Sequence, residues 1–223
     1  MPLILNIETS STICSVCLAK DGKLVDYRED VQGNSHARVL TVFIEDLMQK
    51  NNLTFNQLDA IAVSAGPGSY TGLRIGTSTA KGLCYALSKP LIAVPTLLAM
   101  ADGVMKTVSI PTAAYMPALD ARRMDIYTAV FDANGGELLK TQAVTVNDRL
   151  AEELEPHSPL LVFGSGAEKC KEVFKSLNVQ FVTGIQSDAR FMISLSEAKA
   201  VSGQFEDLAY FEPYYLKEFG AKT

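Results

Sequence analysis

The chain has 223 residues, of which 48% are hydrophobic and 20% are charged, as is typical of a globular protein with one large domain or two small ones. Its formal net charge of −5 argues against a protein that binds nucleic acid on its own, although a local basic patch stays open. The sequence has no stretch of roughly 20 apolar residues and no secretory leader pattern, so we expect a cytoplasmic protein without membrane contact.

The first half of the sequence alternates between strand and helix patterns. Apolar periodicity and turn residues predict three strands, a helix, a strand and a helix, then a short strand and another helix: 3–8, 12–19, 22–30, 35–50, 59–64, 71–87, 91–94 and 96–105. The second half repeats the first six elements in the same order: 112–119, 125–131, 136–145, 147–154, 159–163 and 166–176. A further helix over 188–200 and an extended tail follow.

Each half also places a carboxylate at the end of its first strand, Glu8 in the first and Asp120 in the second. This internal symmetry indicates a duplicated βββαβα unit, with a mixed sheet flanked by helices. We therefore predict an α/β protein with the actin-like ATPase fold (the ASKHA, or RNase H-like, class), in which nucleotides bind in a cleft. The predicted domains are residues 1–105 and 106–223, with the tail packing back on the first.

A glycine-rich loop, SAGPGSYTGLRIG, joins the predicted strand 59–64 to the helix 71–87. It does not match the Walker pattern, because no glycine stands five residues after Gly66 or Gly68. It does not match the dinucleotide-binding pattern either, because Thr71 stands in place of the third glycine. Two interpretations stay open: the loop could hold a phosphate at the helix N-terminus, or it could be a tight turn with Ser69 or Thr71 as the N-cap.

Small residues recur at every fourth position along the helix 71–87: Gly72, Gly76, Ala80 and Cys84. This stripe either packs on the protein's own sheet or lets a helix of another chain come close. The helix 35–50 carries more apolar residues than one buried face requires, which favours a partner surface. These residues are Val39, Leu40, Val42, Phe43, Ile44, Leu47 and Met48. On this interpretation, Gly76→Leu abolishes complex formation and leaves the monomer folded.

Candidates for metal binding or catalysis are few. His36 begins a helix, but Leu40 stands at the i+4 position, where a second metal ligand would be needed. Glu8 and Asp120 could hold a magnesium ion, or each could simply end a strand. We therefore predict no catalytic residue and no metal ligand.

Two further motifs have a structural and a functional interpretation. Gly164 and Gly166 precede the predicted helix 166–176 and could touch an adenosine, or only turn the chain. Cys14 and Cys17 form a C-x-x-C motif, but residues three apart on a strand point to opposite faces. We therefore interpret these cysteines as structural.

Four motifs, spread over nearly the whole chain, carry a family resemblance: Ile4-Leu-Asn-Ile-Glu-Thr-Ser10, Gly66-Pro-Gly-Ser-Tyr-Thr-Gly-Leu-Arg74, Asp120-Ala-Arg122 with Tyr127, and Pro213-Tyr-Tyr-Leu216. Together they resemble the TsaB (YeaZ) family of the bacterial tRNA threonylcarbamoyladenosine machinery. That family is similar to the catalytic subunit TsaD, which has the same fold and an H-x-x-x-H metal pair. TsaD transfers the threonylcarbamoyl group to N6 of adenosine 37 in tRNAs that read ANN codons.

The resemblance implies a non-catalytic scaffold subunit, in which Leu40 replaces the second metal ligand. It implies a heterodimer with TsaD, a homodimer when the chain is alone, contact with the ATPase TsaE, and access to tRNA through TsaD. The chain itself would require no cofactor, while ATP or ADP could bind at the interface of the complex. The helices 35–50 and 71–87 would form that interface through His36, Val39, Val42, Phe43, Gly72, Arg74, Gly76 and Ala80. A remnant of an ancestral phosphate site would comprise Glu8, Gly66, Gly68, Ser69, Asp120, Gly164 and Gly166.

Two enzyme hypotheses compete with this scaffold role. A small kinase or ATPase of the actin-like superfamily would turn over ATP without a partner. A metalloprotease-like activity would need zinc ligands, which two scattered histidines, His36 and His157, do not supply.

Overall fold

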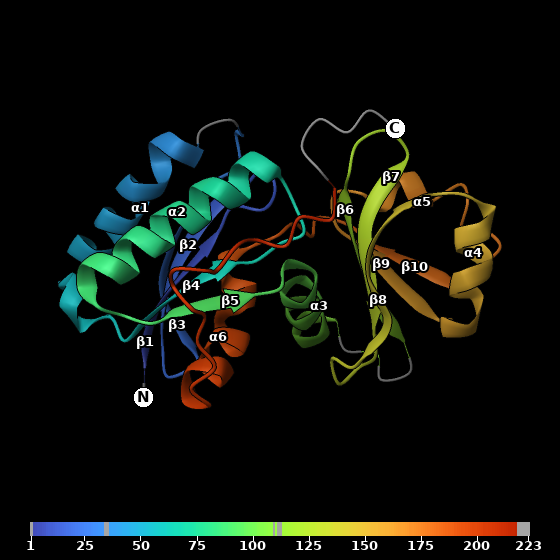
Figure 1. Cartoon of the computed structure of the whole chain (residues 1–223). Coiled ribbons are helices and arrows are strands. Elements are labelled where there is room, and N and C mark those ends of the chain that lie inside the picture. The colour runs from blue at the N-terminus through green and yellow to red at the C-terminus, as the bar shows by residue number, and fades with distance from the viewer. Residues whose placement is uncertain (1, 34–35, 109, 111–112, 218–223) are drawn as a thin grey trace. The chain divides into compact units, whose positions relative to one another are not determined.

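The computed structural model describes residues 2–33, 36–108, 110 and 113–217 (Figure 1). The predicted helix start at Ser35, the predicted strand start at Thr112 and the last residues of the predicted second domain lie outside these residues. The chain divides into two compact units, one from Met1–Thr96 with Ser187–Tyr215 and the other from Leu97–Gln186 with Leu216–Thr223. Each unit is built on one five-stranded sheet.

The first sheet is mixed and has the strand order β3-β2-β1-β4-β5. Its strands are β1 (Leu3–Glu8), β2 (Cys14–Lys20), β3 (Lys23–Asp30), β4 (Ala60–Ser64) and β5 (Leu91–Val94). β1, β2 and β3 pair antiparallel, whereas β1, β4 and β5 run parallel. The carboxyl ends of β1 and β4 therefore lie together, and they position Glu8 beside the glycine-rich loop.

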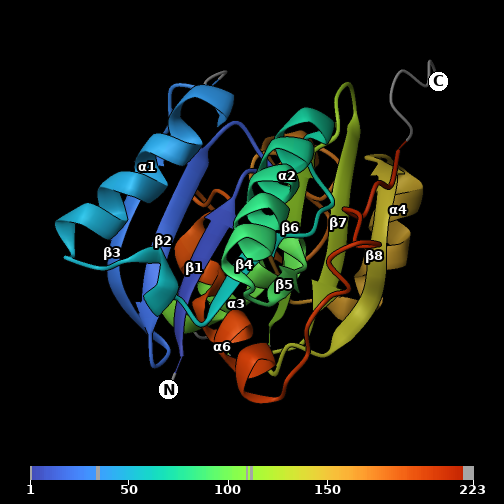
Figure 2. The same cartoon turned by 60° about the vertical axis from the view of Figure 1, so that its left-hand side comes forward.

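Helices cover both faces of the first sheet. They are α1 (His36–Lys50), η1 (Phe55–Gln57), α2 (Tyr70–Leu87), η3 (Ala189–Met192) and α6 (Ile193–Val201). α1 and α2 run side by side on one face, as Figures 1 and 2 both show, and cover a core that includes Leu5 and Cys14. η3 and α6 cover the opposite face, where Cys17 packs against Ala189. The predicted opposite orientation of the two cysteines is confirmed, and both are buried and free.

The second sheet has the order β10-β9-β6-β7-β8, which repeats the first sheet strand for strand with β6 in the place of β1. Its strands are β6 (Ala114–Asp120), β7 (Asp125–Phe131), β8 (Glu137–Thr145), β9 (Leu160–Phe163) and β10 (Val179–Val182). The accompanying helices are α3 (Thr96–Thr107), α4 (Asp148–Leu154), η2 (Glu155–His157) and α5 (Ala167–Cys170). Leu150 and Cys170 pack on one face of this sheet, and Leu97 and Met100 pack on the other.

The predicted fold class and the duplicated order of elements are confirmed, but four details differ. The strand β10 was not predicted, and the helix expected over 166–176 is reduced to α5, followed by turns. The first unit ends at Thr96 instead of 105, because Leu97, Met100 and Val104 of α3 pack on the second sheet. The first unit also includes Ser187–Tyr215, which confirms that the tail packs back on the first domain, although the predicted boundary placed the helix over 188–200 in the second.

Within the described ranges, no helix is both long enough and apolar enough to cross a bilayer.

Candidate functional site

The glycine-rich loop after β4 leads into a capped helix. Ser69 is the N-cap of α2, and its Oγ accepts a hydrogen bond from the backbone N–H of Gly72 at 3.3 Å. The helix begins at Tyr70, one residue before the predicted start. This geometry is the tight strand-to-helix turn that was one of the two interpretations of the loop, with Ser69 and not Thr71 as the cap.

The glycines of this loop lie against the turn that follows β1. A Cβ on Gly68 would lie 2.3 Å from the carbonyl oxygen of Ser10, and a Cβ on Gly72 would lie 2.0 Å from that of Thr9. The backbone N–H of Ser69 donates to the same Ser10 oxygen at 2.6 Å. No side chain fits at such distances, so the close packing of loop on turn explains both glycines without a bound phosphate.

Gly66, the first glycine of the loop, contacts the C-terminal tail. Its backbone is left-handed, with φ at 94°, and a Cβ there would lie 2.7 Å from the carbonyl oxygen of Tyr214. The N–H of Tyr214 donates to the carbonyl oxygen of Ala65 at 2.7 Å. The ring of Tyr215 then lies 4.8 Å from the ring of Tyr70, measured between centroids. The tail therefore packs directly on the loop and on the first turn of α2.

Glu8, at the end of β1, is only 1% exposed. Its Oε1 accepts the backbone N–H of Ser10 at 2.6 Å. Burial raises the pKa of the Glu8 carboxyl, and hydrogen bonds with Ser10 and Ser64 partly oppose the rise. Among the residues that the structure describes, no three or more His, Cys, Asp or Glu side chains group closely enough to hold a metal ion. Glu8 is therefore a buried carboxyl at a strand end, and its Oε1 already binds the N–H of Ser10.

The predicted stripe of small residues on α2 faces the interior of the first unit. Gly72, Gly76, Ala80 and Cys84 are all buried, and a Cβ on Gly76 would lie 2.2 Å from Oγ1 of Thr9. Packing on the protein's own sheet is therefore the correct interpretation. The assignment of Gly72, Gly76 and Ala80 to a partner interface is wrong. So is the expectation that Gly76→Leu leaves the monomer folded, because the added side chain would clash with Thr9.

A second four-residue stripe, which the sequence analysis missed, lies on the outer side of α2. Arg74, Ser78, Gly82 and Ala86 are all exposed. A Cβ on Gly82 would meet no atom within 4 Å, so this glycine has no packing role inside the chain. The four-residue spacing of this stripe can be read from the sequence. The sequence does not show which side of the helix is exposed to solvent.

The predicted interface residues of α1 lie at the rim of its buried face. Val42 is 57% exposed, while Val39 and Phe43 are half-buried and pack against the core. His36 is half-buried, and its Nε2 lies 3.0 Å from the carbonyl oxygen of Ser11. Leu40, four residues further along, is 1% exposed and belongs to the core.

The second unit repeats the glycine arrangement at the end of β6. A Cβ on Gly164, whose φ is 105°, would lie 2.5 Å from the carbonyl oxygen of Ala118. The N–H of Gly166 donates to the same oxygen at 2.8 Å, and the N–H of Asp120 donates to Oγ of Ser165 at 3.0 Å. These contacts favour the chain-turning interpretation of Gly164 and Gly166. Asp120 differs from Glu8, since its side chain is 48% exposed and pairs with Lys169 at 2.8 Å.

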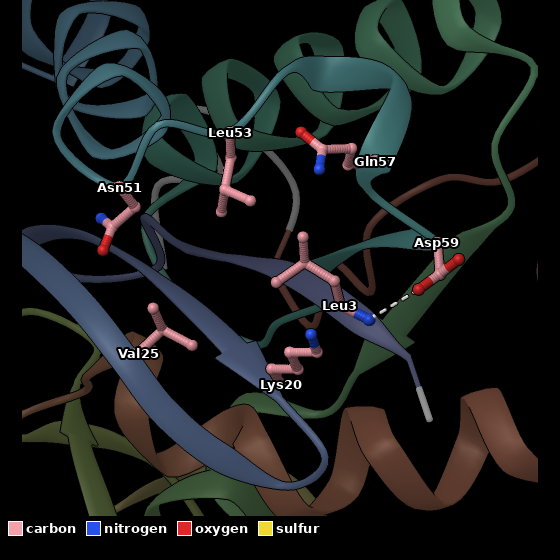
Figure 3. Close-up of a pocket in the computed structure, with 7 residues that line it drawn as sticks. All are labelled: Leu3, Lys20, Val25, Asn51, Leu53, Gln57 and Asp59. Carbon is pink, nitrogen blue, oxygen red and sulfur yellow. Dashed lines mark hydrogen bonds between the residues drawn. The ribbon is translucent and has the colours of Figure 1, made fainter.

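Figure 3 shows a hollow of about 420 Å³ in the first unit, at the amino end of β1 and therefore at the opposite end of that strand from Glu8. The carboxylate of Asp59 accepts the backbone N–H of Leu3 there at 2.7 Å. The hollow is lined by Leu3, Lys20, Val25, Asn51, Leu53, Gln57 and Asp59. None of the predicted site residues lines it, and its lining offers no nucleophile with an adjacent base.

Comparison with known proteins identifies the family. Residues 30–222 match the family model described as TsaD, tRNA N6-adenosine threonylcarbamoyltransferase. The chain is 28% identical over 224 residues to the tRNA threonylcarbamoyladenosine biosynthesis protein TsaB of Buchnera aphidicola subsp. Baizongia pistaciae, covering 96% of this chain and 98% of that protein. The chain belongs to the TsaD family, in its TsaB (YeaZ) branch.

Two further comparisons agree with this placement. TsaB of Escherichia coli K12 is 28% identical over 222 residues, covering 96% of this chain and 94% of that protein. The solved structure of YeaZ from Pseudomonas aeruginosa superposes with a TM-score of 0.81 at 23% identity, covering 97% of this chain and 100% of that chain. This likeness supports the fold.

The structure describes both residues that the resemblance aligns with the metal pair of TsaD. His36 would be the first ligand, but its Nε2 already lies at hydrogen-bond distance from the carbonyl oxygen of Ser11. Leu40 occupies the second position and offers no ligand atom. The residues of this TsaB-branch chain therefore do not fit a TsaD-type metal pair.

Proposed function

We propose that this chain is a non-catalytic subunit of the machinery that transfers a threonylcarbamoyl group to N6 of adenosine 37 in tRNAs reading ANN codons. The names of the family model and of the TsaB relatives support the pathway. The chain acts by binding a TsaD-type catalytic subunit, and it reaches TsaE and tRNA within that assembly. ATP or ADP binds at the joint surface of the complex.

The observation that carries the non-catalytic role is the filled space around the glycine-rich loop. The carbonyl oxygens of Thr9 and Ser10 occupy the positions beside Gly72 and Gly68. The carboxyl group of Glu8 is buried beneath this packing and bonded to the N–H of Ser10. A phosphate and its metal would have to displace the chain's own backbone at this point, which favours a structural use of the loop.

The outer face of α2 supports the partner role. An exposed helical glycine costs about 1 kcal/mol relative to alanine, and nothing inside the chain compensates for it at Gly82. Small side chains at Ser78 and Ala86 extend the same stripe, with Arg74 at one end and Val42 on the neighbouring helix exposed as well. A helix of the catalytic subunit could approach this face closely. A second copy of the chain could do the same when it is alone.

Reconstitution tests the role directly. Threonylcarbamoyl transfer to tRNA is measured with purified components, with this chain present and with it omitted. Omission should abolish product and adding the chain back should restore it, while the chain alone should not turn over ATP. Unchanged product on omission would contradict the proposal, and ATP turnover by the chain alone would favour the kinase or ATPase hypothesis.

A variant pair tests the surface. Gly82→Leu should raise the Kd for the catalytic subunit at least about 100-fold, because the side chain holds the two helices apart, while the monomer keeps its circular dichroism and melting temperature. Glu152→Leu, which places the same side chain on an exposed position of α4 in the other unit, is the matched control and should bind normally. If Gly82→Leu binds the catalytic subunit normally, the outer face of α2 is not part of the interface.

A further inference from the structure

The hollow at the amino end of β1 plays no part in the proposed function. Leu3, Val25 and Leu53 give it an apolar lining, as Figure 3 shows. Val25 is 43% exposed, so part of this lining faces water. The volume of about 420 Å³ lies within the range of small-molecule sites. The hollow therefore has room for a small molecule with an apolar part.

Two opposite charges flank this apolar lining. Lys20 pairs with Leu3 across the antiparallel strands β2 and β1. Asp59 lies on the other side of Leu3, where its carboxylate accepts the N–H of Leu3 at 2.7 Å and its own N–H donates to the carbonyl oxygen of Leu3 at 2.8 Å. Because β1 lies between β2 and β4, the two backbones are two strand spacings apart, roughly 10 Å. Within the described ranges, neither Lys20 nor Asp59 forms an ion pair.

The chain itself orients the two amides of the lining. Oε1 of Gln57 accepts the N–H of Thr54 at 2.7 Å, which leaves Nε2 as a hydrogen-bond donor. Nδ2 of Asn51 donates to the carboxylate of Asp26 at 3.2 Å, which leaves Oδ1 as an acceptor. Asp26 is itself paired with Lys50 at 3.1 Å, so its charge is balanced. The lining therefore offers a cation and an amide donor as well as an anion and an amide acceptor.

We infer that this hollow binds a free α-amino acid with an apolar side chain. Such a molecule carries an ammonium group for Asp59, a carboxylate for Lys20 and an apolar group for Val25 and Leu53. A simple carboxylate would be repelled by Asp59 and a simple amine by Lys20, whereas a zwitterion matches both charges. The amino acid is bound without chemical change, and its binding does not depend on the proposed function.

The test is isothermal titration calorimetry of the full chain with L-leucine and with three relatives that each lack one of its features. Isocaproate lacks the ammonium group, leucinamide lacks the carboxylate and glycine lacks the apolar side chain. L-leucine should bind at one site with a Kd on the order of 1 mM, as suits so small a ligand in an open hollow. Each relative should bind at least about tenfold more weakly. No saturable binding of L-leucine up to about 10 mM would overturn the inference.

Two variants assign the contacts. Lys20→Met removes the ammonium group and keeps an apolar stem, so it should bind leucine and leucinamide equally. Asp59→Asn keeps an oxygen that can accept the N–H of Leu3, and it should bind leucine and isocaproate equally. Lys140→Met makes the same change at an exposed position of the other unit and should keep the selectivity of the wild type. Leucine binding that neither Lys20→Met nor Asp59→Asn alters would place the site elsewhere and overturn the inference.

The end of a polypeptide chain is the other occupant that the measurements separate. An N-acetylated dipeptide that ends in leucine has the carboxylate and the apolar side chain but no ammonium group, so it should bind as weakly as isocaproate. Tighter binding than that of free leucine would mean that the hollow accepts a protein segment, and the inference would be wrong. Threonylcarbamoyl transfer is not measured in any of these titrations, so failure of this inference and failure of the proposed function are distinguishable.

Discussion

The turns that follow β1 and β6 occupy the same place in two copies of one topology, yet they have opposite environments. After β1, Glu8, Thr9 and Ser10 are at most 2% exposed and lie beneath the glycine-rich loop. After β6, Asp120 is 48% exposed at its side chain and leads into two exposed arginines. The two units thus share one topology but differ at these turns: the first turn is part of the core, and the second is exposed.

Both units nevertheless use glycine for the same physical purpose. The loop after β4 places Gly68 and Gly72 against backbone carbonyls at the end of β1, and the loop after β9 places Gly164 against a carbonyl of β6. In each unit the glycines allow a strand-to-helix connection to pack on the end of the neighbouring parallel strand. Glycine content alone therefore does not separate a ligand-binding loop from a close-packed one.

The largest effect should come from adding one methyl group to the packed loop. Gly72→Ala places a Cβ where the carbonyl oxygen of Thr9 lies 2.0 Å away, so the turn or the helix must move. We expect a loss of about 3 kcal/mol or more in the free energy of unfolding, measured by urea denaturation. Gly164→Ala should have an effect of the same order in the second unit. If one of the two variants is harmless, the structural equivalence of the two loops is wrong.

The second largest effect should come from neutralising the buried carboxyl. Glu8 keeps its proton to higher pH in the folded chain than in the unfolded chain, where the pKa is near 4.5. Unfolding therefore releases a proton above about pH 4.5, and stability falls as the pH rises, until the folded-state pKa is passed. Glu8→Gln removes this loss and should stabilise the chain on the order of 2 kcal/mol at pH 8.

The pH profile is the decisive control for this variant. Thermal melts of wild type and Glu8→Gln should converge below about pH 4.5, where both side chains are neutral in both states. A constant difference across all pH values would mean that the amide changes packing and that the charge of Glu8 is irrelevant to stability.

Much of the fold could be predicted from the sequence, because apolar periodicity and turn residues are strong in this chain. The predicted bounds of the strands over 3–8, 91–94 and 125–131 coincide with the observed ones. β10 was missed because Val179–Val182 is a short segment, and its apolar residues are only half-buried. The boundary at 105 was misplaced because α3 follows the first sheet in sequence but packs its apolar face on the second.

The candidate site was predicted less well, and α2 shows why. Periodicity identifies the residues that share a face of a helix, but it does not say which face turns inward. α2 carries two stripes at the same spacing, one through Gly72 and Gly76 and one through Ser78 and Gly82. The clash distance at Thr9 decides between them, and no sequence pattern contains that distance.

A smaller effect of opposite sign should follow from Gly82→Ala. Its Cβ would meet no atom within 4 Å, and alanine is the better helix former, so the isolated chain should gain about 1 kcal/mol in stability by urea denaturation. The same methyl group that destabilises the chain at position 72 is thus tolerated ten residues further along the helix. A loss of stability would mean that Gly82 has an internal packing role after all.

The smallest effect on stability should come from Asp120→Asn, the counterpart of Glu8→Gln in the second unit. The asparagine Oδ1 can still accept the N–H of Arg122, while the partly exposed ion pair with Lys169 is lost. Because such pairs contribute little, the free energy of unfolding should fall by less than about 1 kcal/mol. A loss above about 2 kcal/mol for Asp120→Asn would show that the second turn is as integral to packing as the first, and the contrast between the two turns would then be wrong.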